Sequence, residues 1–131
     1  MRKIIILSAF CFFAIKAKSQ TFYQCFDSDT NAKLKISVKF VNDKAISVKY
    51  KGQTQAIPLV YVKQVYEKGS ANTTTIYNEK FNGKITGKYL ITHSGVWDYE
   101  KYRRQDGKVF NFTINQDLSV SGDSYRKTSC Y

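Results

Sequence analysis

Hydrophobic and polar residues alternate along most of the chain from about residue 20 onward. Residues 33–40, KLKISVKF, place only apolar side chains on one face and three lysines and a serine on the other. Residues 45–52 repeat the pattern, and Ile46, Val48 and Tyr50 are expected on its inner face. Because successive side chains of a strand point to opposite faces, this period of two predicts half-buried β-strands.

Two dipeptides mark tight turns between further alternating segments. Asn82-Gly83 separates residues 73–81 from 84–93, and Asp106-Gly107 separates residues 96–104 from 108–115. Asn-Gly and Asp-Gly pairs readily adopt the positive φ angles that short hairpin turns require. Each dipeptide therefore predicts a β-hairpin.

Three more strands complete the predicted set, at residues 21–26, 55–66 and 118–122. Pro58 indicates an edge or a bulge in the second of these, because proline cannot donate a hydrogen bond to a neighbouring strand. The total is eight or nine antiparallel strands, without a convincing amphipathic helix. Short strands at regular spacing favour a sandwich or a closed barrel, and closure removes exposed strand edges. We therefore predict an all-β fold, a small antiparallel β-barrel of about eight strands, with a β-sandwich as the alternative.

Residues 1–19 have the pattern of a secretory signal peptide. A positively charged start is followed by an apolar run to Ile15 and by small residues at positions 17 and 19. The apolar run is shorter than the roughly 20 residues that a membrane-spanning helix needs. The expectation is a secreted or periplasmic protein cleaved before Gln20, with residues 20–131 as a single β domain and no transmembrane span in the mature chain.

The three cysteines predict one disulfide. Cys11 falls within the predicted signal peptide, which leaves Cys25 near the mature start and Cys130 next to the end. An even number of cysteines in an exported chain indicates pairing. A bond between Cys25 and Cys130 would close the barrel by holding the first strand beside the last.

The charge balance is strongly basic. The chain has 21 Lys and Arg against 10 Asp and Glu, a net charge of +11, and loss of the four basic residues within 1–19 leaves +7. A face with Lys33, Lys35, Lys39, Lys49 and Lys51 would attract an anionic component of the cell envelope. The simpler interpretation is a solvated strand face whose lysines discourage edge pairing. No nucleic-acid-binding motif accompanies these lysines, so nucleic acid is not an expected partner.

Catalytic chemistry is poorly supported. His93, Ser94 and Asp98 are the residue types of a hydrolase triad, but neighbours in a strand point to opposite faces, which separates His93 from Ser94. Asp98 and Glu100 share a face and could serve glycoside hydrolysis, although solvated ion pairs with lysines are the commoner use of such acids. One histidine and two paired cysteines leave no set of metal ligands. We expect a non-catalytic protein without metal or cofactor.

Residues 94–104, SGVWDYEKYRR, are the richest segment for partner binding. If a turn occurs at Ser94-Gly95, Trp97 shares the inner face with the next aromatic residue, and Asp98 faces outward. Trp97 is then expected in the core. Exposed tyrosine and arginine are enriched where proteins bind one another. The candidate partner-binding residues are therefore those at the two ends of this segment: Ser94, Gly95, Tyr102, Arg103 and Arg104.

Several stretches resemble the bacterial membrane-bound and periplasmic inhibitors of c-type lysozyme. They are FYQC at residues 22–25, YKGQTQAIPL at 50–59, the Ser94-Gly95 segment and the terminal Cys130. The resemblance implies an eight-stranded antiparallel barrel that inserts a loop with a Ser-Gly-x-x-Tyr motif into the lysozyme cleft. Here Asp98 stands at the tyrosine position of that motif. The specific functional hypothesis is a lysozyme-type inhibitor; a cell-envelope binding or structural module with an unknown ligand is the alternative, and a small secreted hydrolase is third.

Overall fold

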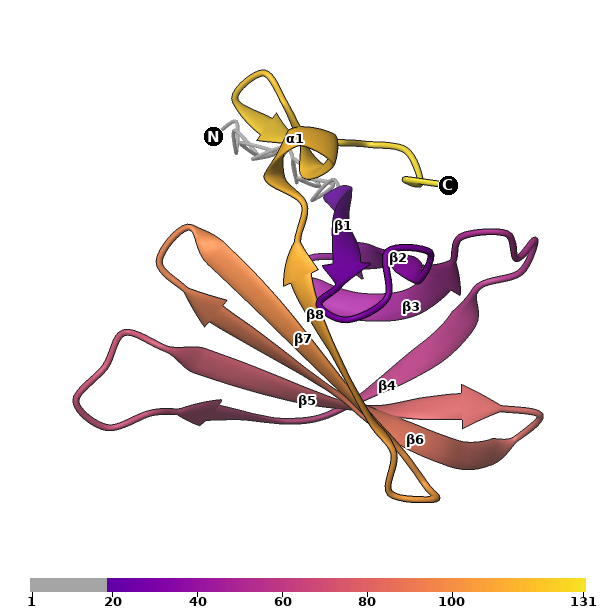
Figure 1. The fold of residues 1–131 in the computed structure, drawn as a ribbon. Coiled ribbons are helices and arrows are strands. Elements are labelled where there is room, and N and C mark those ends of the chain that lie inside the picture. Colours follow the sequence, from indigo (N-terminus) through magenta and orange to yellow (C-terminus); the bar gives the residue numbers. More distant parts are fainter. Residues whose placement is uncertain (1–18) are drawn as a thin grey trace, which may run out of the picture.

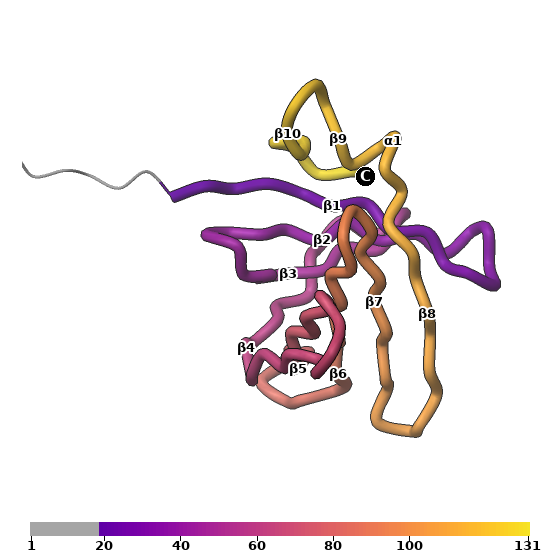
Figure 2. The backbone as a smooth tube through the Cα atoms, turned by 90° about the vertical axis from the view of Figure 1, so that its left-hand side faces the viewer, coloured from indigo at the N-terminus to yellow at the C-terminus, as the bar shows by residue number. Residues whose placement is uncertain are grey.

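The computed structural model describes residues 19–131 as a closed barrel of eight antiparallel strands (Figures 1 and 2). Each strand pairs with the next along the chain, and β8 returns to β1. The predicted barrel is therefore confirmed over the sandwich. The predicted signal segment up to residue 18, with Cys11, lies outside the described residues. The strands are β1 (Thr21–Ser28), β2 (Lys35–Val41), β3 (Lys44–Tyr50), β4 (Ile57–Tyr66), β5 (Thr73–Phe81), β6 (Lys84–Ser94), β7 (Trp97–Arg104) and β8 (Val109–Ile114).

A small C-terminal unit lies beside β1 in both views (Figures 1 and 2). It contains the single-turn helix α1 (Gln116–Ser119) and a two-stranded sheet of β9 (Val120–Ser121) and β10 (Ser124–Tyr125). The helix was not expected from the sequence, because one turn is too short to show helical periodicity. Asn115 caps it by accepting a hydrogen bond from the Leu118 N–H at 3.1 Å. The buried Ser119 hydroxyl accepts a hydrogen bond from the Cys25 N–H at 2.8 Å, which fixes the unit to β1.

The predicted disulfide between Cys25 and Cys130 is present. Its structural role differs from the expectation, because Cys130 follows β10 and belongs to no strand of the barrel. Backbone pairing between β1 and β8 closes the barrel instead. The disulfide holds the C-terminal tail against β1, and the Cys130 N–H donates to the Ser37 hydroxyl of β2 at 3.1 Å. Among residues 19–131, no helix is long and apolar enough to cross a membrane.

The predicted hairpin turns are both found. Asn82 and Gly83 have φ angles of 49° and 75°, and Gly107 has a φ of 88°. A third turn of this kind, at Asn42-Asp43 between β2 and β3, was not predicted; its φ angles are 50° and 65°. Asparagine and aspartate tolerate positive φ better than most residues, so this dipeptide was a readable signal.

One residue of β3 faces opposite to the prediction. Phe40 pairs with Ala45 and Lys39 pairs with Ser47, so Ile46 is an extra residue in the ladder. This bulge reverses the alternation: Ala45 is 3% exposed and Ile46 is 38% exposed. Val48 remains buried, as expected.

Strand β7 presents the opposite face to the interior from the one predicted. Trp97 is 46% exposed, whereas Asp98, Glu100 and Tyr102 are buried. The reason is the pairing with β6, in which Tyr102 lies opposite the buried Tyr89. Residues directly opposite in an antiparallel pair share a face, so the apolar face of β6 determines which face of β7 is inside.

Gly87 on β6 makes room for the ring of Tyr102. A Cβ atom at Gly87 would lie 2.8 Å from the Tyr102 hydroxyl and 2.9 Å from its Cζ. The ring cannot easily move away, because it stacks on Tyr89 at 4.5 Å and its hydroxyl donates to Glu79 at 2.8 Å.

Substitution of Gly87 by alanine is therefore expected to lower the free energy of unfolding by about 1–3 kcal/mol through overpacking. Urea unfolding of the variant measures the effect. Lys88→Ala, at the next and exposed position, is the control and should stay within about 0.5 kcal/mol of the wild type. Equal stabilities for the two variants would contradict the steric argument.

Candidate functional site

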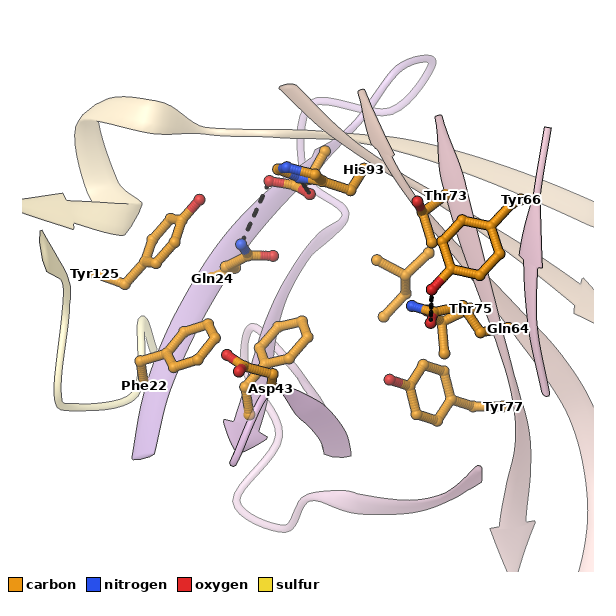
Figure 3. Close-up of a pocket in the computed structure, with 13 residues that line it drawn as sticks. Phe22, Gln24, Asp43, Gln64, Tyr66, Thr73, Thr75, Tyr77, His93 and Tyr125 are labelled. Carbon is orange, nitrogen blue, oxygen red and sulfur yellow. Dashed lines mark hydrogen bonds and ion pairs between the residues drawn. The ribbon is translucent and has the colours of Figure 1, made fainter. Parts of the chain in front are cut away.

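The barrel opens into a cleft at the end where β3 and β4 separate. These strands pair only through Ser47 with Pro58 and Val48 with Ile57. Pro58 has no N–H to donate, and a bulge between Tyr61 and Lys63 follows in β4. The cleft has a volume of about 360 Å³ (Figure 3). Its walls come from six strands of the barrel, from the β2–β3 turn and from β10: Phe22, Gln24, Phe40, Asp43, Gln64, Tyr66, Thr73, Thr75, Tyr77, Ile91, His93, Asp98 and Tyr125.

Tyr77 bridges the gap between the separated strands. Its ring is buried on β5, and its hydroxyl accepts a hydrogen bond from the Ala45 N–H of β3 at 3.0 Å. Burial raises the pKa of Tyr77. The tyrosine thus supplies the acceptor that a neighbouring strand would otherwise provide at Ala45.

An acid and an amide lie at one wall of the cleft. Asp98 Oδ1 is 2.7 Å from His93 Nδ1, and Asp98 Oδ2 accepts a hydrogen bond from Gln24 Nε2 at 3.4 Å. Burial raises the pKa of Asp98, and the contacts with His93 and Gln24 oppose that shift. The Gln24 side chain is buried, and its Oε1 atom has no hydrogen-bond partner.

Aromatic rings form the adjoining wall. Phe22 stacks on Phe40 with centroids 4.9 Å apart, and on Tyr125 at 5.3 Å. Tyr125 belongs to β10, so the C-terminal unit held by the disulfide completes this wall. The cleft consequently combines hydrogen-bond acceptors with aromatic surface.

The cleft brings together only part of a hydrolase triad. His93 and Asp98 come together as the acid–base part of a triad would, across the β6–β7 pair. Within residues 19–131, however, no hydroxyl or thiol is hydrogen-bonded to His93, and Ser94 does not line the cleft. Nucleophilic catalysis needs that contact. Nor does any group of three potential ligands for a metal ion occur in this part of the chain.

Two of the predicted partner-binding residues lie beside the cleft. Ser94 is the last residue of β6 and pairs with Trp97, and Gly95, with a φ of 61°, begins the two-residue β6–β7 turn. The next residues are exposed apolar side chains, Val96 at 74% and Trp97 at 46%. The β6–β7 tip, defined as residues 94–97, is therefore an apolar projection next to the acceptor-rich wall.

The other predicted residues lie at the opposite end of β7. Tyr102 is only 7% exposed, so the expectation of an exposed tyrosine there is wrong. Arg103 is exposed, whereas Arg104 is half-buried and donates to Asp106 from Nε at 3.0 Å. Tyr102 and Arg104 line a second pocket of about 290 Å³. The structure thus does not bring the two ends of the predicted segment together.

Sequence reasoning missed Gln24 and Asp43 and placed Asp98 on the wrong face. Asp43 could have been located as part of a turn, because the Asn42-Asp43 dipeptide favours the positive φ angles of a hairpin. Gln24 carried no signal that points to a site, because its place in the cleft depends on two contacts with residues distant in sequence: β1 meets β10, and the Gln24 side chain reaches Asp98 of β7.

The predicted lysine face is partly engaged in contacts within the molecule. Lys35 forms an ion pair with Asp27 at 2.9 Å. Lys49 donates to the Tyr131 carbonyl at 2.9 Å, and the Lys51 ammonium lies 5.6 Å from the Tyr131 ring centroid. These contacts hold the C-terminal tail and leave a less continuous cationic surface than the sequence suggested.

Comparison with known proteins identifies no relative: no protein-family model, curated protein or solved structure matches this chain.

Proposed function

We propose that the mature chain is a non-catalytic binding protein outside the cytoplasm, and that it holds a protein partner at the β6–β7 tip and the adjoining cleft. The observation that carries the proposal is the pair of exposed apolar side chains at Val96 and Trp97. Exposed tryptophan is a residue type enriched in interface hot spots. The disulfide favours an oxidising compartment.

A lysozyme-type enzyme is the first partner to test, because the Ser94-Gly95 turn resembles the inserted loop of the lysozyme inhibitors. The half-exposed Trp97 is well suited to contact a partner, and its truncation should leave the barrel folded. Arg103 lies at the other end of β7 and is the matched surface control.

The experiment measures c-type lysozyme activity with residues 20–131 at micromolar concentration. Wild-type protein is expected to inhibit. Trp97→Ala should weaken inhibition at least tenfold, a loss of about 1.4 kcal/mol or more of binding energy. Ser94→Ala tests the turn itself, and Arg103→Ala should inhibit like the wild type. Circular dichroism checks the folding of each variant.

Absence of inhibition by the folded wild type would remove lysozyme as the partner. The alternative, a module that binds an anionic envelope component, would then take its place. Its exposed lysines, such as Lys33, support it, although the contacts of Lys35 and Lys49 reduce the free positive charge. Salt-sensitive cosedimentation with anionic vesicles tests that alternative.

A further inference from the structure

The cleft has a charge opposite to that of the protein. Within residues 19–131, no lysine or arginine lines the cleft, whereas Asp43 and Asp98 both do. Lys44, next to Asp43 in sequence, lies 4.5 Å from the ring centroid of Tyr61 and is not part of the lining. Complementarity of charge therefore favours a cationic occupant.

The same cleft contains a polar atom that lacks a partner. Gln24 is 5% exposed, and its amide nitrogen is used by Asp98. Its amide oxygen accepts no hydrogen bond and points toward the space between Phe22 and Tyr77 (Figure 3). Buried acceptors of this kind are normally satisfied. Lysine and arginine side chains carry donors only, so they match the Gln24 oxygen and the exposed carboxylate of Asp43. The Asp98 oxygens already contact His93 and Gln24, so Asp98 adds negative charge to the cleft wall.

The aromatic wall fits the same kind of group. Phe22, Phe40 and Tyr125 form a continuous stack on one side of the cleft, and Tyr66 and Tyr77 lie on the other (Figure 3). A cation is attracted to an aromatic face within about 6 Å of its centroid, and arginine also stacks on such faces. The methylene part of a long basic side chain would pack against these rings.

The backbone of β4 is free to pair along the cleft. Beyond Leu59, β4 pairs with β5 on one side, and among the described residues no strand pairs with its other side. An extended polypeptide can add to such an edge through main-chain hydrogen bonds, with its alternate side chains entering pockets. The cleft lies next to this edge, since Gln64 and Tyr66 of β4 line it.

We propose that this cleft binds a lysine or arginine side chain on an extended segment of a partner protein, which pairs with the free edge of β4. The proposal deepens the function proposed above and rests on it for the partner being a protein. It does not depend on that partner being a lysozyme.

Synthetic peptides test the proposal directly. The probe is a fluorescent seven-residue peptide of alternating threonine and valine with a central arginine. The matched control replaces arginine by citrulline, which has a similar shape but no charge. The arginine peptide should bind at least tenfold more tightly. Methylation of the backbone nitrogens that face β4 should weaken binding at least tenfold, because it removes the donors used in strand pairing.

Asp43→Asn is the decisive protein variant, because asparagine keeps the positive φ of the turn while removing the charge. It should reduce the preference for arginine over citrulline at least fivefold. Asp123→Asn, an exposed acid outside the cleft, should leave the preference unchanged. In nitrogen-15 NMR spectra, the arginine peptide should shift the Gln24 side-chain amide and the β4 backbone amides.

Equal binding of the arginine and citrulline peptides would overturn the cationic site, as would an unchanged preference in Asp43→Asn. If the methylated peptide bound as tightly as the unmethylated arginine peptide, strand addition would be overturned. The two proposals can fail separately. Peptide binding without lysozyme inhibition contradicts only the lysozyme hypothesis, and inhibition by a protein that binds none of the peptides contradicts only the cationic cleft.

Discussion

Replacement of Glu100 by glutamine is expected to prevent most of the loss of stability that the wild-type protein undergoes as the pH rises from 4.5 to 8. Glu100 is 1% exposed, and neither of its carboxyl oxygens has a hydrogen-bond partner. The negative charge of an ionised Glu100 contributes to raising the pKa of Tyr50, Tyr77 and Tyr89, which are themselves largely buried. Burial raises the pKa of Glu100 from 4.5 to about 8, because the ionised form is poorly solvated in the barrel.

The direction in which the free energy of unfolding changes with pH depends on whether the folded or the unfolded chain holds the proton. Below pH 4.5, Glu100 is protonated in both the folded and the unfolded chain. Between pH 4.5 and 8, the folded protein retains the proton and the unfolded chain releases it, so the free energy of unfolding falls as pH rises. A shift of this size corresponds to a loss on the order of 5 kcal/mol. Asp98, whose pKa is also raised by burial, acts in the same direction.

Urea unfolding at several pH values between 4 and 9 measures this dependence. Glu100→Gln should have a much shallower slope and should be more stable than the wild type at pH 8. Asp123→Asn, which removes an exposed acid, should follow the wild-type slope. Parallel slopes for Glu100→Gln and the wild type would show that the pKa of Glu100 is not raised in the folded barrel.

Loss of the disulfide is the second large effect. The double variant Cys25→Ala/Cys130→Ala should unfold with a free energy about 2–5 kcal/mol below that of the wild type. The bond joins residues 105 apart, so it restricts the unfolded chain strongly. It also holds the C-terminal unit, whose Tyr125 stacks on Phe22 in the cleft. The arginine peptide should therefore bind the double variant more weakly as well.

Intact-mass analysis under non-reducing, alkylating conditions first tests whether the bond is present in protein expressed with its predicted signal peptide. Two alkylated thiols would contradict its presence. Thermal and urea unfolding then compare the wild type with the double variant. Reducing agent should lower the stability of the wild type to that of the double variant and leave the variant unchanged. A double variant as stable as the oxidised wild type would contradict the stabilising role.

The local pattern of the chain was sufficient for much of the barrel. The turns at Asn82-Gly83 and Asp106-Gly107 and the disulfide between Cys25 and Cys130 were all predicted and are all present. Turn chemistry and strand alternation depend on residues close in sequence, and the predicted loss of Cys11 with the signal peptide leaves only one pairing of the remaining two cysteines. These features can therefore be read without knowledge of long-range contacts.

The candidate site was predicted only in part. Ser94 and Gly95 lie beside the cleft, but Tyr102 is buried at the far end of β7. The error at Trp97 came from assigning the more apolar face of β7 to the interior. The inner face of β7 instead carries polar groups, two of which have partners on other strands: Gln24 donates to Asp98, and Glu79 accepts from the Tyr102 hydroxyl. Glu100 on the same face has no such partner.

The sequence by itself determined that this protein is built from antiparallel strands, where its main hairpins turn and which cysteines pair. Only the tertiary structure decided which face of β7 is buried, how Ile46 is displaced by a bulge, and where β3 and β4 separate. The physical reason is that alternation divides the side chains of a strand between two faces but does not specify which face is buried. Pairing with β6 makes that choice for β7, and the cleft of Gln24, Asp43 and Asp98 exists only once distant strands have met.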